Sequence, residues 1–590
     1  MSAGEFLFKD LSLVVPGEVG SGSQGTTCVK PNGILLYCNR GDSTGNIDEI
    51  VLALIDLKTG SLIAGPLFVP GARQFGTTGV SLFRIVCAPT DTGFGIIFDE
   101  TQSSTTNRRK RYMHITDAGV IDIAPLNVIN DATAQNNNLA HMRSNNAGTR
   151  MALLLSTEVT QGSDPRLFRV VEIDKSGSIT AGPHQLDAAP PGAQVINIQN
   201  PRLAADLDDS GWGIFWGSNQ GGSPPGGFWY AHMVSGGAID VPKTQLFDTS
   251  PDENNLHDVC ATTTGFGALL KREVSSRDTA FWVHINKNGT GATTPLNVSE
   301  AVQVLEGVPF DQNFVFSRGG HLKTDATNGG CHMMLSDRLR KEDPIEFAPS
   351  AVDPVGDTIT IPEIGTGFST LEANFSNIGG ALPTPLTAGP GVHFISDEHL
   401  GTPGLFLVYN DFFDAIVDQN RIDILDQGSG THIFNQTLTL IYWFYAHLSE
   451  GGTIDNGPYK VHFNPNQTAV VTEGNSMQLV DDDTILFTSD FKDEENNSVR
   501  GSSLVNRLTG EITEQWIRPE TDFGGSFPQM FGCVVIPENP ERRVAFFNNR
   551  FDPGGGTGNF FDAIDAFRRF IAIQDNGVNN LVIDNLEVSQ

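Results

Sequence analysis

Histidines occupy matching positions in several repeated segments of the chain, a pattern that could place metal ligands together. His114, His232, His284 and His447 each stand in the third expected strand of a repeated unit. Imidazole is the commonest protein ligand of transition metals, so such histidines could converge on one ion. Strand residues at one register in different units of a ring lie far apart, however, and a half-buried histidine is readily satisfied by a neighbour. We therefore predict no metal site.

Acidic turns suggest calcium binding or glycan chemistry, and both patterns are incomplete. Asp206-Leu207-Asp208-Asp209-Ser210-Gly211 alternates carboxylates, but an EF-hand needs glutamate at the twelfth position, which here is Gly217. The turn Asp174-Lys175-Ser176-Gly177-Ser178-Ile179-Thr180 resembles the Asp-box of sialidases, but it lacks the leading serine and the closing tryptophan. A glycan-binding or glycan-cleaving propeller at a surface therefore stays an alternative.

No established catalytic motif is present in the sequence. There is no P-loop, dinucleotide fingerprint, HExxH or GxSxG pattern. The 69 acidic residues guarantee candidate carboxylate pairs, so such a pair identifies no glycosidase by itself. We predict no catalytic residue, no cofactor and no enzymatic activity.

The six cysteines show no CxxC or Cys/His spacing, which argues against zinc. Four of them fall in the first strand of their own unit, namely Cys28, Cys87, Cys260 and Cys533. We predict free, buried thiols throughout.

Two segments are candidates for contacts with other proteins. The densest basic run is Arg108-Arg109-Lys110-Arg111, expected in the hairpin loop between the second and third strands of its unit. It is either a solvated loop tip or a contact to an acidic partner. Phe412 and Phe413 lie in an apolar and acidic stretch of an expected insertion, and insertions in repeat proteins often form the binding face.

The elements that must position these residues repeat along the chain. Residues 229–240 read WYAHMVSGGAID and residues 444–455 read FYAHLSEGGTID, which is a strand, a glycine turn and a second strand. The turns at Gly60, Gly119, Gly177 and Gly236 are separated by 59, 58 and 59 residues, from the differences of their numbers. Two further strands precede each hairpin, so each unit of about 58 residues holds four strands.

Four-stranded units in a radial array predict an all-β fold, a single large β-propeller of eight or nine blades. The unit that would turn at Gly356 is a weak copy, and the ring has eight blades if that unit is an insertion and nine if it is a blade. We expect residues 1–22 to form a closure segment, of which residues 5–15 would pair with the last unit. Residues 23–590 would form the propeller, with an insertion near 410–440.

Charge excludes several classes of partner. The formal net charge is −32, which argues against nucleic-acid binding through phosphate neutralisation and against docking on anionic membranes. The N-terminal residues show no basic segment followed by an apolar run, so no secretory signal and no membrane insertion are expected.

Residues 201–216, PRLAADLDDSGWGIFW, resemble the ALxDGGFVVxW repeats of large bacterial propeller-like proteins. The composition and expected architecture are similar to propeller-containing tail proteins of bacteriophages, such as nozzle proteins. That resemblance implies a structural component of a virion tail that forms homo-oligomers and binds other virion proteins. A cytoplasmic scaffold is a further alternative.

Overall fold

The structure is a computed structural model. It describes residues 6–10, 26–41, 49–56, 61–69, 80–102, 108–130, 136–158, 166–188, 197–219, 227–248, 254–274, 277–306, 317, 319–347, 358–361, 371–374, 392–396, 405–409, 423–424, 432–463, 477–480, 483–492, 498–519, 529–535, 542–548 and 568–574.

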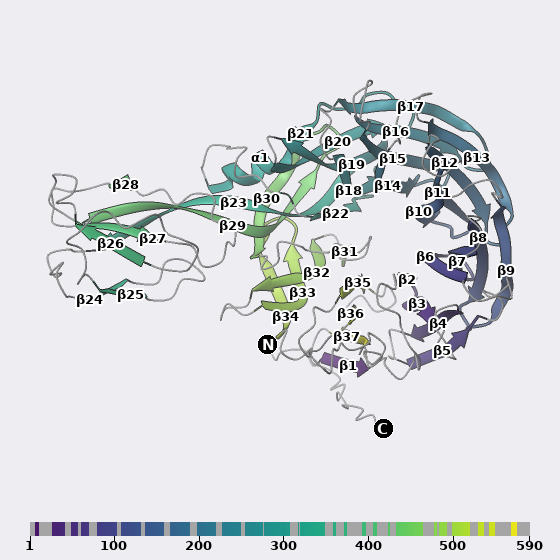
Figure 1. The fold of residues 1–590 in the computed structure, drawn as a ribbon, viewed down its shortest axis with the longest axis horizontal. Helices are drawn as coiled ribbons and strands as arrows, with labels where there is room; N and C mark the ends of the chain where they lie inside the picture. Colours follow the sequence, from purple (N-terminus) through teal and green to yellow (C-terminus); the bar gives the residue numbers. More distant parts are fainter. Residues whose placement is uncertain are drawn as a thin grey trace.

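Seven four-stranded antiparallel sheets form most of the molecule (Figure 1). Three of them follow one another from the N-terminal side: β2 Thr26–Val29, β3 Ile34–Gly41, β4 Glu49–Asp56 and β5 Ser61–Phe68; β6 Val80–Pro89, β7 Gly93–Gln102, β8 Arg108–Thr116 and β9 Ile121–Asn130; β10 Asn136–Ser144, β11 Arg150–Glu158, β12 Arg166–Asp174 and β13 Ile179–Ala188. The other four are β14 Asn197–Ala205, β15 Gly211–Asn219, β16 Gly227–Val234 and β17 Ile239–Asp248; β18 Asn254–Ala261, β19 Gly265–Val274, β20 Arg277–Asn286 and β21 Leu296–Asn297; β31 Met477–Leu479, β32 Thr484–Lys492, β33 Ser498–Asn506 and β34 Ile512–Pro519; β35 Gln529–Val535, β36 Arg542–Asn548, β37 Arg568–Gln574 and β1 Phe6–Asp10.

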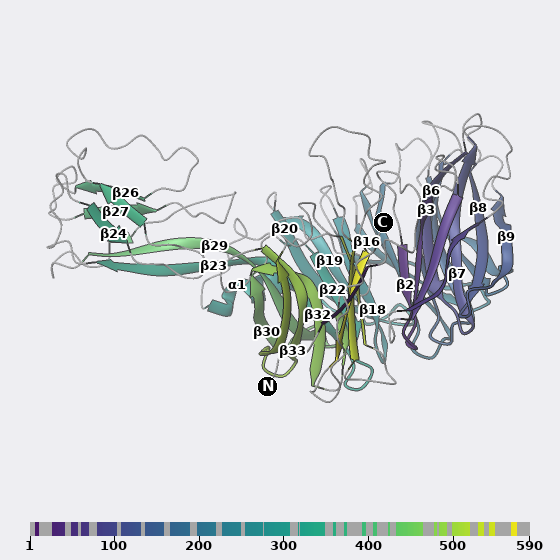
Figure 2. The same cartoon turned by 90° about the horizontal axis from the view of Figure 1, so that it is seen from below.

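A larger, five-stranded sheet carries an extension that leaves the ring. Its strands are β22 Gly319–Thr324, β23 Cys331–Phe347, β29 His432–Leu448 and β30 Ile454–Phe463, with β28 Asp423–Ile424 beside β29. Between β23 and β29 lie two small hairpins, β24 Thr358–Ile361 with β25 Leu371–Asn374, and β26 Val392–Ser396 with β27 Leu405–Tyr409. We call the outer halves of β23 and β29 together with β24–β28 the arm. Figure 2 shows the arm projecting sideways from the ring.

The first strands of consecutive sheets are neighbours around the centre. Contacts join β2 to β6, β6 to β10, β10 to β14, β14 to β18, β18 to β22, β22 to β31, β31 to β35, and β35 back to β2. Apolar cores lie between the faces of neighbouring sheets. Phe215 and Tyr230 of one sheet, for example, pack on Phe266 of the next. Each sheet therefore buries its apolar faces only by stacking on its neighbours, as expected of a repeat protein.

The predicted all-β, propeller-like repeat of four-stranded units is confirmed. The hairpin turns after the third strands contain glycines with positive φ, including Gly119, Gly177 and Gly236, at the predicted positions. The weak unit predicted to turn at Gly356 has its turn outside the described residues. The predicted insertion at 410–440 overlaps the end of the arm and the first half of β29.

The two ends of the chain meet in one sheet. β1 pairs antiparallel with β37, with Phe8 opposite Ile571. The N-terminal strand thus supplies the fourth strand of the sheet that β35–β37 begin. The predicted bounds of a closure segment, 1–22, stay a prediction.

Helix is scarce in the part of the chain that the structure describes. One turn-and-a-half α-helix, α1 Val298–Gln303, is followed by a 3₁₀ turn, η2 Val304–Glu306. Among these described residues, no helix has the length and apolar character needed to cross a bilayer.

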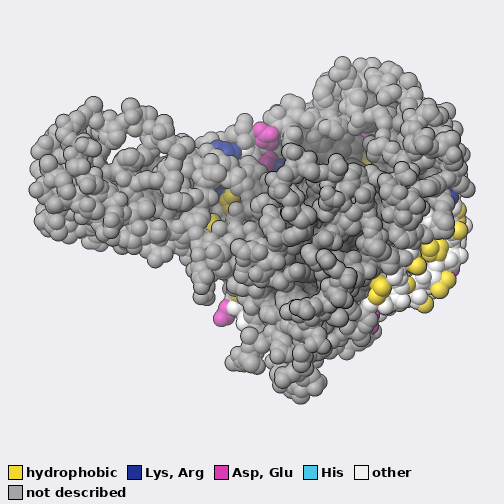
Figure 3. All heavy atoms as spheres, turned by 60° about the horizontal axis from the view of Figure 1, so that its bottom comes forward, with side chains coloured by type: hydrophobic (Ala, Val, Ile, Leu, Met, Phe, Trp, Pro, Cys, Tyr) yellow, Lys and Arg dark blue, Asp and Glu magenta, His cyan; other side chains and the backbone are white. Residues whose placement is uncertain are grey.

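Figure 3 shows one face of the molecule, where the coloured, described side chains include a group of hydrophobic ones at the edge of the ring. Exposed apolar side chains in the structure include Leu62, Val120 and Ile179. Scattered side chains of this kind are normal on soluble proteins.

Candidate functional site

In the sheets that contain them, the recurring histidines link the turn after the first strand to the third strand through their side chains. In each case the turn between the first and second strands begins with a polar residue whose side chain meets the third-strand histidine. Thr90 Oγ1 lies 2.8 Å from His114 Nε2, and Thr262 Oγ1 lies 2.9 Å from His284 Nε2. The other nitrogen of His114 bonds a fourth-strand carboxylate, Asp122, at 2.6 Å. His114 and His284 therefore have hydrogen-bond partners inside their own sheets.

The sheet β14–β17 shows a fully ionic form of this arrangement. His232 is buried between two carboxylates, with Nδ1 2.6 Å from Asp240 and Nε2 3.2 Å from Asp206. Lys287 of the next sheet places its ammonium 2.5 Å from Asp206. Burial alone would lower the pKa of His232, but the hydrogen bonds to the two carboxylates outweigh it and raise the pKa. The two carboxylates thus favour the protonated form of His232.

In the predicted calcium-like turn, Asp206 and Asp208 both accept from the Ser210 hydroxyl, and the Lys287 ammonium lies 2.5 Å from Asp206 and 3.2 Å from Asp208. A lysine therefore stands where these two carboxylates meet. Asp208 accepts from Ser210, and Asp209 accepts from the backbone N–H groups of Asn146 and Ala147 in the neighbouring sheet. The turn is used for contacts within and between sheets.

In the sheet that carries the arm, the corresponding end holds one aspartate and two histidines. Asp325, His332 and His447 lie with ligand atoms within 4.8 Å of one another, and all three are buried. The Nε2 atoms of His332 and His447 each lie 3.4 Å from Asp325 Oδ2. A group of two imidazoles and a carboxylate is one that could hold a metal ion.

His332 is the added member of this set. It pairs directly with His447 across the β23–β29 ladder. In three other sheets the residue opposite the third-strand histidine is a glycine: Gly95 opposite His114, Gly213 opposite His232, and Gly267 opposite His284. The space at Gly213 is filled by Phe266 of the next sheet, whose ring would lie 2.7 Å from an added Cβ. In the sheet that follows His332, the residue that corresponds to Phe266 is Ile485, the second residue of β32, and its side chain is smaller.

Each ligand atom of this cluster is oriented by a second partner. His447 Nδ1 lies 2.5 Å from Asp455, so a donated Nδ1–H leaves Nε2 directed at Asp325. His332 Nδ1 lies 3.0 Å from the Tyr445 hydroxyl. Asp325 Oδ1 accepts from the backbone N–H groups of Thr327 and Asn328, which fixes the carboxylate. Partners of this kind are typical of histidine and carboxylate metal ligands.

The Tyr445 hydroxyl has a different hydrogen-bond partner from the tyrosines at the same position in two other sheets. Tyr112 and Tyr230 stand two residues before the third-strand histidine, as Tyr445 does, and donate to backbone oxygens of Lys175 and Lys287 in the next sheet. Tyr445 instead reaches His332. The change accompanies the presence of a histidine at position 332.

The charge of the cluster is not balanced as it is around His232. Burial, reinforced by His447, lowers the pKa of His332 to about 4, so this imidazole is neutral at neutral pH. Arg507 of the next sheet approaches Asp325 Oδ2 only to 3.5 Å, whereas Lys287 comes to 2.5 Å from Asp206. His447 Nε2 is buried and has no hydrogen-bond partner.

A buried glutamate that sequence reasoning missed takes the histidine's place in the sheet β10–β13. Glu172 is fully buried and accepts hydrogen bonds from both its own and the next sheet. The donors are Arg150 at 3.0 Å, Thr180 at 2.6 Å, Trp212 at 2.7 Å, Ser235 at 2.9 Å and the Gly236 N–H at 2.8 Å. Burial would raise the pKa of Glu172, but these hydrogen bonds outweigh it and keep the pKa below its usual range.

The predicted basic loop is part of a strand. The run begins β8 at Arg108, and Lys110 and Arg111 are buried. Arg111 donates to the Pro125 backbone oxygen at 2.6 Å and lies over the Phe98 ring. The prediction of an exposed loop tip is therefore wrong for these two residues, because the long alkyl parts of Lys and Arg can line an apolar interior. The side chains of Arg108 and Arg109 lie outside the described residues, as do Phe412 and Phe413, so contacts through them stay a prediction.

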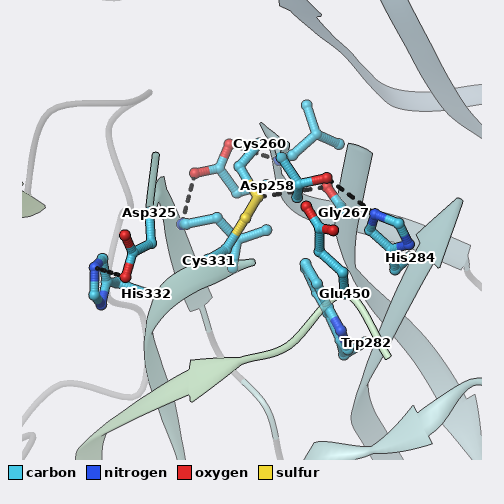
Figure 4. Close-up of a disulfide and its surroundings, with 12 residues drawn as sticks. Asp258, Cys260, Gly267, Trp282, His284, Asp325, Cys331, His332 and Glu450 are labelled. Atoms are coloured by element: carbon cyan, nitrogen blue, oxygen red, sulfur yellow. Dashed lines mark hydrogen bonds and ion pairs between the residues drawn. A yellow bond between two sulfur atoms is a disulfide. The ribbon is translucent and has the colours of Figure 1, made fainter. Parts of the chain in front are cut away.

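The prediction of free thiols is also partly wrong. Cys260 of β18 and Cys331 of β23 form a disulfide, while Cys28, Cys38 and Cys87 are free. Figure 4 shows the disulfide on one side of β23 and His332 directed toward Asp325 on the other. The two cysteines are 71 residues apart and belong to different sheets, so no local spacing could reveal the pair.

No protein-family model and no curated protein matches the chain. Solved structures similar to it include one from a study of two prolyl endopeptidases, at 10% identity and a TM-score of 0.32, covering 84% of this chain and 54% of that one. The chain thus spans about half the length of that protein. The polysaccharide lyase Uly1 is similar at 8% identity and a TM-score of 0.37, covering 95% and 90%. The β-propeller domain of the Trilobed protease from Pyrococcus furiosus is similar at 8% identity and a TM-score of 0.30, covering 53% and 77%.

These proteins are enzymes, and the prediction that this chain is not an enzyme is corrected accordingly. The prediction had relied on the absence of known motifs, which is a weak argument because catalytic residues in repeat folds come from separate units. The likenesses concern the fold and identify no activity for this chain.

Proposed function

We propose that this chain is an eight-bladed β-propeller that serves as a scaffold and docks onto other proteins of a bacteriophage virion tail through its arm. The eight blades would be the seven four-stranded sheets and the sheet of β22, β23, β29 and β30. The observation that carries the proposal is the ribbon of β23 and β29. Each strand has 17 residues, while strands at the same place in other blades have 7 to 10.

The length of the ribbon supports a docking role. Seventeen residues at about 3.3 Å each span about 55 Å, roughly twice a blade strand. The ladder is continuous from Cys331 opposite Leu448 to Phe347 opposite His432, with no register shift. A continuous two-stranded ribbon can hold the hairpins β24–β27 away from the ring, where a partner can reach them.

The composition supports an assembly rather than a nucleic-acid binder. A formal net charge of −32 repels DNA, so a ring of copies of this acidic propeller would let DNA pass without holding it. Homo-oligomerisation is part of the proposal.

The test is a variant without the arm. Leu339 and Leu440 are paired in the ladder, so residues 340–439 can be replaced by Asn-Gly, a sequence that favours a two-residue hairpin turn. We expect the shortened chain to fold with the far-UV circular dichroism of a β protein. It should fail to join particles when co-expressed with the products of neighbouring genes, as seen by negative-stain electron microscopy. Incorporation equal to that of the full chain would contradict the docking role.

A glycan-acting propeller is the alternative to exclude. Purified full-length chain would be incubated with a panel of neutral and acidic polysaccharides, and new reducing ends and unsaturated products would be measured. Turnover that persists in the shortened chain would favour the alternative and would move the functional site from the arm to the ring.

A further inference from the structure

We propose that Asp325, His332 and His447 form a site for zinc or a similar divalent transition metal, at the end of their sheet opposite the arm. The proposal is independent of the virion role. Three arguments support it: the geometry of the ligand atoms, the direction of their lone pairs, and the contrast with the matched site around His232.

Two of the three distances between ligand atoms match a tetrahedral ion, and all three atoms lie within 4.8 Å of one another. Ligand atoms bonded to zinc at about 2.0–2.1 Å lie about 3.4 Å from each other in a tetrahedral site. The two nitrogen-to-oxygen separations, from His332 and His447 to Asp325 Oδ2, are both 3.4 Å. This is too long for a good hydrogen bond and is the length of a tetrahedral edge.

The hydrogen-bond partners direct lone pairs at one point. When Nδ1 of His447 donates to Asp455 and Nδ1 of His332 donates to Tyr445, both Nε2 atoms present lone pairs to a carboxylate oxygen. Three acceptors facing one another in a buried place are unfavourable unless a cation lies between them. Arg507 is the nearest protein cation described, 3.5 Å from Asp325 Oδ2, and the Asn328 side-chain amide donates to the same oxygen at 3.1 Å. His447 Nε2 nevertheless stays buried without a hydrogen-bond partner.

The site around His232 has the same backbone arrangement with one histidine, so it shows which contacts form when the second histidine is absent. There His232 lies between Asp206 and Asp240, and the Lys287 ammonium lies 2.5 Å from Asp206. Glycine stands at 213, where the arm-bearing sheet has His332. With histidine at this place, the set contains two imidazoles and a carboxylate.

The set of donors defines the class of metal. Two imidazoles and one carboxylate suit zinc and similar divalent transition metals better than calcium or magnesium, which prefer oxygen ligands. The three ligands leave a fourth position for water or for another group. The ligands come from the β22–β23 turn, β23 and β29, so the ion would tie these elements together at the end opposite the arm.

The experiment uses the full, tag-free chain. Protein treated with EDTA and then dialysed against limiting Zn²⁺ should retain about one zinc per chain, by elemental analysis. His332→Gly places at this position the residue found in three other sheets, and His332→Gln keeps its polarity; both should fold and lose the zinc. His232→Gln is the matched control and should keep it.

Affinity gives a graded readout. Asp455→Asn removes the partner of His447 and should weaken zinc binding by about 10–100-fold in a competition titration with a chromogenic chelator. Asp240→Asn, the equivalent change beside His232, should leave zinc affinity unchanged. Wild-type protein that holds no zinc above background would overturn the site, as would equal zinc content in wild type and His332→Gly.

Discussion

Asp206, His232 and Asp240 in the sheet β14–β17 match Asp325, His447 and Asp455 in the sheet that carries the arm, yet the two sets are completed differently. The first is closed by Lys287 and leaves Gly213 to make room for Phe266. The second admits His332 and keeps Arg507 at a distance. The difference shows how a few substitutions at one copy of a repeated structural motif can change its side-chain chemistry while the other copies keep the fold.

The largest expected effect tests whether Glu172, which stands at the third-strand histidine position of the sheet β10–β13, holds two neighbouring sheets together. Glu172→Leu leaves the side chains of Arg150 and Trp212 and the Gly236 N–H without their acceptor. We expect a loss of about 3–5 kcal/mol in the free energy of unfolding, measured by urea denaturation. Glu172→Gln, which keeps the shape, should cost less. Equal stability of the leucine variant and wild type would show that this position is no anchor.

The next effect tests why glycine is kept opposite His232. Gly213→Ala introduces a Cβ 2.7 Å from ring atoms of Phe266, so the packing between two sheets must shift. We expect destabilisation of about 1–3 kcal/mol in the same assay. Gly237→Ala is the control, because its nearest neighbour would be 3.4 Å away. Similar costs for both variants would mean that the room at Gly213 is not needed.

The pH dependence of stability should separate His232 from the proposed ligands. The folded-state pKa of His232 is raised, so its stabilising effect is present below the unfolded pKa of about 6.5 and is lost as pH rises through the folded pKa. His232→Gln should therefore cost more stability near pH 6 than near pH 9, by thermal unfolding at both. A cost that grows with pH would contradict the raised pKa of His232.

The smallest effect is expected at the exposed partner of the same histidine. Asp240 is about half exposed, so Asp240→Asn should change the free energy of unfolding by no more than about 1 kcal/mol. Measured at high and low salt, the difference between variant and wild type should shrink at high salt. A cost as large as that of Glu172→Leu would mean that Asp240 is a main support of the sheet.

The sequence predicted the fold well because the fold repeats. The turn glycines, such as Gly119 and Gly177, recur at a near-constant interval and require positive φ, so the hairpins can be placed from them. The arm is different, because it interrupts one unit between β23 and β29. Its effect in the sequence is to separate partners such as His332 and His447 by more than one hundred residues.

The candidate metal site carried one signal that could have revealed it. The second strands begin Gly93-Phe94-Gly95, Gly211-Trp212-Gly213 and Gly265-Phe266-Gly267, and the matching segment is Gly330-Cys331-His332. Alignment of these starts shows histidine where the others have glycine. The disulfide from Cys260 to Cys331 and the burial of Lys110 had no such signal, since both depend on contacts between neighbouring strands and sheets.

The pairing of β1 with β37 has a consequence for the order of events in the cell. Residues 6–10 leave the ribosome long before their partner strand, which begins at Arg568. At about 5–20 residues per second, the N-terminal strand waits roughly half a minute to two minutes for that partner. During translation it is an unpaired strand able to pair with another nascent chain on the same message. The closing step is therefore the point at which a chaperone, or slow dilution during refolding, should improve the yield most.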